Sequence, residues 1–114
     1  MRPYETPEIQ DKLNIIKESV LQVVPDTEAI YIFGSYVYGE PHKDSDLDIC
    51  VIVPDSAVEC ERPLEIGFHI RRSYSDKLHF PTDLLVKGSS VFENRKHRQT
   101  LDKVIANRGV RFYG

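Results

Sequence analysis

The first part of the chain carries apolar residues at helical spacing. Between residues 9 and 23, five apolar side chains follow one another at intervals of three or four residues, which predicts a helix of about five turns with one apolar stripe. The stripe consists of Ile9, Leu13, Ile16, Val20 and Val23. Thr6 and Pro7 are typical of a helix start, as a capping residue followed by proline at the first helical position.

Further along, apolar residues gather in short continuous runs instead. The runs at residues 29–33, 47–53 and 82–86 are rich in apolar and β-branched side chains and predict buried strands. A glycine or a proline follows closely on each of them and is expected to end the strand. Residues 110–113 predict one further extended segment.

Two more helices are expected in the second half of the chain. Between residues 59 and 79, an apolar stripe at helical spacing predicts a helix, with Ile70 outside the stripe. The residues of this stripe are Leu64, Phe68, Tyr74 and Leu78. Residues 90–93 have the pattern of a capping box and open a last helix that ends near Gly109. The order of elements predicts a mixed α/β (α+β) fold, with a small sheet of three or four strands and helices packed on one side.

Length and composition are those of an ordinary globular chain. The 114 residues correspond to a single domain, residues 1–114, which is large enough to bury a core. No apolar run approaches the roughly 18 residues that a membrane helix requires, and the N-terminus has no apolar signal region. We therefore expect a cytoplasmic protein without a membrane partner.

The net charge of −3 hides an asymmetry along the chain. Residues 1–70 contain five Lys or Arg against fourteen Asp or Glu, whereas residues 71–114 contain ten against four. A divalent cation would offset part of the charge of the acidic half, and the basic half suits phosphates or an acidic partner. Nucleic acid is not an expected partner, because the net charge is negative and aromatic residues do not alternate with the basic ones. Homo-oligomerisation stays open.

Asp46 and Asp48 stand at the start of the strand predicted at residues 47–53. Alternate side chains of a strand share one face, so the two carboxylates point the same way from Cα atoms about 6.6 to 6.8 Å apart. Carboxylates this close resist joint ionisation unless a cation lies between them. The two cysteines and four histidines of the chain have no metal-ligand spacing. Oxygen ligands alone favour Mg²⁺ or Mn²⁺.

Three further residues extend this candidate site. Asp83 begins the next predicted strand and completes a three-carboxylate site if the two strands are neighbours; it would then bind a metal ion at the acceptor oxygen and help to take its proton. Gly34 and Ser35 follow the first strand, where glycine allows backbone N–H groups to approach an anion closely. A helical turn beginning at Ser35 would add free N–H groups and a hydroxyl for a phosphate.

The stretch GSYVYGEPHKDSDLD resembles the signature of the DNA polymerase β-like nucleotidyltransferase superfamily, in which Gly-Ser is followed after ten residues by Asp-x-Asp. Asp83, at the head of a later strand, matches the third acidic position. The C-terminal ANRGVRFYG is similar to the ending common in the minimal nucleotidyltransferases, the small branch of that superfamily. The resemblance runs from about residue 9 to the end of the chain, and no Gly, Ser or Asp position departs from the pattern.

The resemblance implies an enzyme that moves a nucleoside monophosphate, with AMP as the expected one, from a nucleoside triphosphate to an acceptor hydroxyl, with pyrophosphate leaving. It assigns Asp46, Asp48 and Asp83 to catalysis and to metal ions, with Asp83 on the acceptor side. It assigns Gly34 and Ser35 to the β- and γ-phosphates of the triphosphate. Lys43 is interpreted as a solvated side chain, with a phosphate contact as the alternative.

Minimal members of the superfamily typically act with a separate helical HEPN protein, and several such pairs are toxin–antitoxin systems in which the nucleotidyltransferase modifies a tyrosine of the toxin. The resemblance therefore implies ATP and a HEPN-domain protein as partners. One alternative is an antitoxin or regulatory module that binds nucleotide and metal but turns over little. Others are a small-molecule nucleotidyltransferase of the aminoglycoside type and a metal-binding structural domain.

Overall fold

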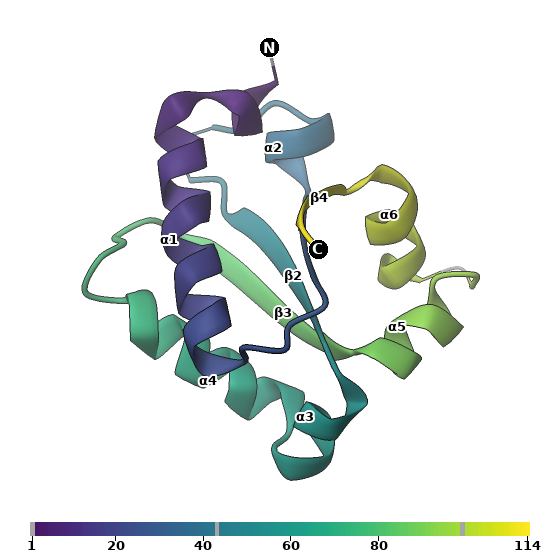
Figure 1. Cartoon of the computed structure of the whole chain (residues 1–114). Coiled ribbons are helices and arrows are strands. Elements are labelled where there is room, and N and C mark those ends of the chain that lie inside the picture. The colour runs from purple at the N-terminus through teal and green to yellow at the C-terminus, as the bar shows by residue number, and fades with distance from the viewer. Residues whose placement is uncertain (1, 43, 99) are drawn as a thin grey trace.

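The computed structural model describes residues 2–42, 44–98 and 100–114 of the chain (Figure 1). In chain order, its elements are the short 3-10 helix η1 (Pro3–Glu5), α1 (Pro7–Val23), β1 (Ala29–Phe33), α2 (Ser35–Tyr38), β2 (Leu47–Val53), α3 (Asp55–Cys60), α4 (Pro63–Tyr74), β3 (Thr82–Gly88), α5 (Ser89–Arg95), α6 (Leu101–Arg108) and β4 (Val110–Tyr113). None of the helices in these described ranges is both long and apolar enough to cross a membrane.

The four strands form one mixed sheet in the order β3-β2-β1-β4. β1 is antiparallel to both β2 and β4, whereas β2 and β3 run parallel. A parallel pair requires a crossover connection, which α3 and α4 supply. The mixed α/β fold class predicted from the sequence is confirmed, as are the strands at 29–33 and 47–53, the strand that begins at residue 82, and the extended segment at 110–113.

The predicted first helix is confirmed together with its apolar stripe. The Thr6 side chain caps α1 by accepting a hydrogen bond from the Ile9 N–H at 3.4 Å. Ile9, Leu13, Ile16 and Val20 are buried in the main core, where they meet the sheet face formed by alternate residues of β2. Side chains of this kind each contribute about 1.5 to 3 kcal/mol when fully buried, so α1 is fixed mainly by its packing on the sheet.

The helices cover both faces of the sheet, and not one face as predicted. α1 and α4 lie together over the face that carries Ile49 and Val51, and α5 and α6 lie away from them on the opposite face (Figure 1). That second face is apolar beyond Asp48, because Cys50 and Ile52 follow it there and form a second cluster with Phe92 of α5 and Ile105 of α6. These apolar side chains require cover, which explains the second helical layer.

Helix α4 is placed as predicted, but a different stripe is buried. Ile66, Gly67, Ile70 and Tyr74 face the core, while Leu64 is 86% and Phe68 60% exposed. Gly67 allows the close approach, since a Cβ at this position would lie 3.6 Å from Val86 of β3. Of the predicted stripe, Tyr74 and Leu78 are buried, whereas Leu64 and Phe68 are exposed; Ile70, which was placed outside the stripe, is buried.

The single last helix predicted from residue 90 is in fact two. α5 ends at Arg95 and α6 begins at Leu101, with Thr100 capping α6 through a bond from the Lys103 N–H at 3.4 Å. The predicted capping box at residues 90–93 is also wrong, because α5 begins one residue earlier and the Ser90 side chain instead hydrogen-bonds to Asp55.

Candidate active site

The three predicted acidic residues lie at the end of the sheet where β2 and β3 begin. Asp48 and Asp83 are register partners in the parallel β2–β3 pair, so they stand side by side on strands about 4.8 Å apart. Asp46 lies directly before β2, and both Asp46 and Asp83 are exposed, whereas Asp48 is half-buried. The sequence placed Asp83 beside Asp46 and Asp48 on the condition that β2 and β3 are neighbours. The sheet meets this condition.

Gly34 lies directly against the Asp48 carboxylate. Its φ of 81° is in the left-handed region, which side-chain-bearing residues adopt only at a cost. A Cβ at this position would overlap the carboxylate of Asp48 and would also lie 3.3 Å from the Asp48 Cβ. Register explains this contact, because Phe33, the residue before Gly34, pairs with Asp48 across the β1–β2 ladder. Glycine is required here on both counts.

Burial and the two neighbouring carboxylates affect the ionisation of Asp48. Burial, then the negative charge of Asp83, then that of Asp46 raise the pKa of Asp48 from 3.8 to about 6. Burial also raises the pKa of the Tyr36 phenol, with smaller effects from Glu8 and Asp46. The site therefore concentrates negative charge that a bound cation would stabilise.

The donor set fits a hard divalent cation, because it consists of carboxylate oxygens without thiolate or imidazole. In residues 2–42, 44–98 and 100–114, no three Asp, Glu, His or Cys side chains already stand close enough together to form a ready-made metal site. Asp48 and Asp83 nevertheless share a register position on neighbouring strands.

The short helix α2 begins at Ser35, immediately beyond Gly34. The Gly34 carbonyl accepts hydrogen bonds from the N–H groups of Val37 at 3.0 Å and Tyr38 at 3.1 Å, which closes the turn. Among the described residues, no acceptor faces the N–H groups of Ser35 and Tyr36. These donors at the start of the turn are free to bind an anion.

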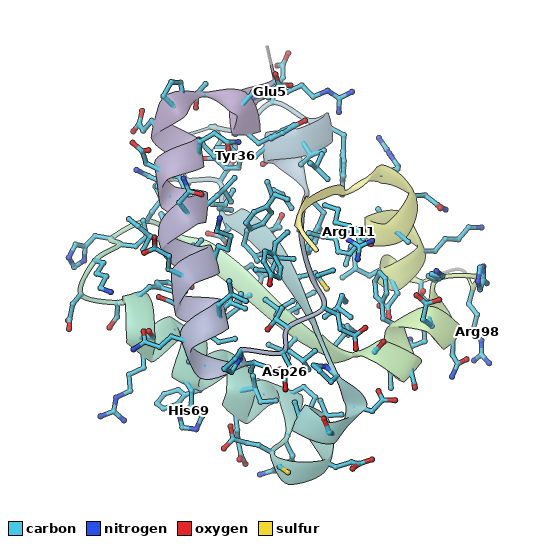
Figure 2. The ribbon with its side chains drawn as sticks, viewed as in Figure 1. Glu5, Asp26, Tyr36, His69, Arg98 and Arg111 are labelled. Atoms are coloured by element: carbon cyan, nitrogen blue, oxygen red, sulfur yellow. The ribbon has the colours of Figure 1, made fainter. Side chains whose placement is uncertain are left out.

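The two tyrosines of α2 have different surroundings. Tyr36 is buried between α1 and α2 (Figure 2) and packs edge-on against Phe80, with ring centroids 6.1 Å apart. It is part of the main core. Tyr38 is 37% exposed, and the Arg108 guanidinium lies 4.4 Å from its ring centroid.

Arg108 is a neighbour of the site that sequence reasoning missed. Val110 pairs with Ile32 across the β1–β4 ladder, so residues 108 and 34 stand at the same level just beyond it. Asp48 thus lies against Gly34, and the Arg108 guanidinium lies over Tyr38 at the other end of α2. Pairing between strands that are far apart in sequence creates this arrangement, and no local motif signals it. Lys43, interpreted from the sequence as a solvated side chain with a phosphate contact as the alternative, lies outside the described residues.

Asp102 of α6 was also not predicted as a polar core residue. It is 1% exposed and its carboxylate lies 3.4 Å from the Lys87 Nζ and 4.0 Å from the Arg95 Nε. Burial, and secondarily the Asp102 charge, raise the pKa of the neighbouring Cys50 thiol to about 12. In the sequence, Asp102 is one charged residue in an otherwise ordinary helix and carries no signal of burial.

Comparison with known proteins assigns the chain to a family. The family model described as the nucleotidyltransferase domain matches residues 13–109, a range that contains all the predicted site residues. The chain belongs to the nucleotidyltransferase domain family. This confirms the resemblance to the minimal nucleotidyltransferases of the polymerase β-like superfamily, and with it the expected class of enzyme.

Individual proteins match this nucleotidyltransferase domain over a short segment or at low sequence identity. A segment of 33 residues is 46% identical to the protein adenylyltransferase MntA of Shewanella oneidensis, covering 29% of the chain and 24% of that relative. The chain thus matches about a quarter of the length of this curated relative.

Two solved structures show the same fold. A candidate nucleotidyltransferase is 22% identical, with a TM-score of 0.61 over 89% of this chain and 97% of the other. A toxin–antitoxin structure with AMP-PNP is 20% identical, with a TM-score of 0.51 over 89% of this chain and 72% of the other.

Proposed function

We propose that this nucleotidyltransferase domain transfers AMP from ATP to an acceptor hydroxyl, with pyrophosphate as the leaving group. The observation that carries the proposal is the contact between Gly34 and the Asp48 carboxylate, beside Asp83 on the parallel neighbouring strand. A phosphate held at the Gly34–Ser35 turn would therefore lie next to a carboxylate-bound cation.

Enzymes of this family generally use divalent metal ions. We infer that Asp46 and Asp48 hold Mg²⁺ or Mn²⁺ together with the triphosphate, and that Asp83 holds an ion on the acceptor side. Such ions neutralise the phosphate charge and polarise the attacked phosphorus. Asp48 contributes as a ligand only in its ionised form, which its pKa of about 6 allows at neutral pH.

The chain's own groups supply the rest of the chemistry. The N–H groups of Ser35 and Tyr36 and the Ser35 hydroxyl donate to the β- and γ-phosphates, and Arg108 supports the same end of the nucleotide. The acceptor oxygen attacks the α-phosphorus while the bond from that phosphorus to the bridging oxygen of the β-phosphate breaks. The proton of the acceptor hydroxyl passes to Asp83 or to a water that Asp83 orients.

We propose a tyrosine of a helical HEPN-domain partner as the acceptor, within a toxin–antitoxin pair. The support is the 33-residue match to an adenylyltransferase and the fold shared with a toxin–antitoxin protein that was crystallised with AMP-PNP. This chain would then act as the antitoxin, by adding AMP to the toxin.

Label transfer tests the proposal directly. The purified chain, a co-expressed HEPN candidate and Mg²⁺ are incubated with ATP that is labelled on either the α- or the γ-phosphate. Label from the α-position alone is expected on the partner, and Tyr→Phe variants of the partner locate the acceptor. Label from the γ-position would indicate a kinase, and no label from either position would contradict the proposed transfer. If Asp48→Asn still neutralises the toxin partner, the chain would act as an antitoxin by binding the partner and not by modifying it.

A further inference from the structure

Strand β3 forms one edge of the sheet and presents an apolar centre there. It pairs with β2 on one side only. Among the residues that the structure describes, no backbone hydrogen bond joins the outer edge of β3 to another element. Its middle residues are Leu84, Leu85 and Val86, with charged residues only at positions 83 and 87. Open edges of this kind pair readily with another strand.

An apolar groove runs along the same edge. Residues of α4 and β3 line it, and they include Pro63, Leu64, Phe68, Leu84 and Leu85. Leu64 and Phe68 are the two most exposed large apolar side chains among the described residues, at 86% and 60%. Apolar side chains that gather beside an unpaired strand mark an interaction surface.

The sequence of β3 is complementary to itself when two copies run antiparallel about Leu85. In that register Leu85 faces Leu85 of the partner subunit, and Leu84 faces Val86 of the partner subunit. Asp83 then faces Lys87 of the partner subunit, and Lys87 faces Asp83 of the partner subunit. Apolar side chains therefore meet at the centre and opposite charges at the two ends, which favours cross-strand pairing. Each Lys87 also lies 3.4 Å from Asp102 of its own chain.

The position of α4 suits this arrangement. Gly67 of α4 lies over Val86 of β3, so the neighbouring Phe68 stands close to the centre of the strand. A two-fold axis through Leu85, perpendicular to the sheet, keeps both α4 helices on the same face. The two copies of Phe68 and Leu64 would then cover one another across the axis, as an isologous interface requires.

We propose that the chain forms a two-fold homodimer by antiparallel pairing of β3 with β3 of a second copy. The two sheets continue into one across the pair, and the α4 helices close the interface on one face. The proposal shares Asp83 with the candidate active site, so its tests measure assembly in the absence of metal and nucleotide and can fail separately from the proposed nucleotidyl transfer.

Mass measurement in solution tests the existence of the dimer. Light scattering after gel filtration should give twice the 13.2 kDa mass of the chain. Phe68→Lys should weaken association at least about tenfold, as for a central interface residue. Leu101→Lys is the matched control, because Leu101 is 46% exposed on α6 at the opposite face, and it should remain dimeric.

Cross-linking tests the register. Directly opposed residues of an antiparallel pair have Cα atoms about 4.5 to 5.5 Å apart, which is within disulfide range. In a Cys60→Ser background, Leu85→Cys should therefore form a covalent dimer on oxidation. Val91→Cys, on α5 and 47% exposed, should not.

Four results would overturn the proposal: a monomer at all concentrations, a dimer that tolerates Phe68→Lys, a dimer that cross-links at residue 91 and not at residue 85, or a monomer whose groove binds only a different protein.

Discussion

Replacing Asp48 by Asn should stabilise the metal-free protein above pH 6 while removing metal binding. Burial, and then the negative charges of Asp83 and Asp46, destabilise the ionised form of the Asp48 carboxylate. They raise its pKa from 3.8 to about 6. The folded protein therefore binds more protons than the unfolded chain between these two values. Stability consequently falls as the pH rises from about 4 to about 6 and stays reduced above that range.

The size of the effect follows from the same shift. A difference of about two pKa units corresponds to about 3 kcal/mol, and solvent screening of this half-buried side chain reduces the expected value to about 1 kcal/mol. For a domain of this size, about 1 kcal/mol raises the melting temperature by about 4 °C. Asn keeps the shape of the side chain without its charge.

Thermal unfolding of the wild-type protein and Asp48→Asn, with a chelator at pH 8 and again at pH 4.5, measures this effect. We expect Asp48→Asn to melt higher at pH 8, with a smaller difference at pH 4.5, and we expect added Mg²⁺ to stabilise only the wild-type protein. Asp11→Asn, at an exposed position of α1, should change neither result. Equal melting temperatures of the wild-type protein and Asp48→Asn at pH 8 would refute the electrostatic argument.

Three further predictions concern the surroundings of the carboxylates. Gly34→Ala should lower stability by about 1 to 3 kcal/mol, because residue 34 has a positive φ. It should also abolish metal-dependent nucleotide binding, and unchanged binding by calorimetry would contradict the close packing of Gly34 on Asp48. Arg108→Ala should weaken ATP binding about tenfold and leave AMP binding nearly unchanged, whereas Arg111→Ala, on the neighbouring strand β4, should affect neither ligand. Lys87→Ala should destabilise the fold by about 3 kcal/mol in urea unfolding, because it leaves the buried Asp102 carboxylate without its nearer cation. A loss below about 1 kcal/mol would show that Asp102 does not depend on Lys87.

Much of the fold could be predicted from the sequence because its strongest signals are local. The apolar stripe of α1, the cap at Thr6 and the continuous strand of residues 47–53 each specify one element without reference to the rest of the chain. The spacing from Gly34 to Asp48 likewise identified the candidate site, since a strand end and a strand start that are joined by a short connection must lie close together. Asp83 could be added only on the condition that its strand is a neighbour.

The errors arose where tertiary contacts decide. The apolar residues of α4 fit two overlapping stripes, and only the packing of Gly67 on Val86 selects the one that contains Ile66 and Ile70. The second helical layer covers Cys50 and Ile52, the apolar side chains that follow Asp48 on the same face of β2. The pattern of apolar residues along the chain does not indicate which helix covers them. Arg108 comes to lie over Tyr38 of α2 through the tertiary packing of α6 and β4.

The central claim is that the carboxylates at the head of β2 and β3 hold the metal ion through which ATP binds. Calorimetric titration of ATP into the wild-type protein and Asp48→Asn, with Mg²⁺ and with a chelator, tests it most directly. We predict binding only for the wild-type protein with Mg²⁺. Equal ATP affinity in Asp48→Asn, or in the absence of Mg²⁺, would contradict the claim.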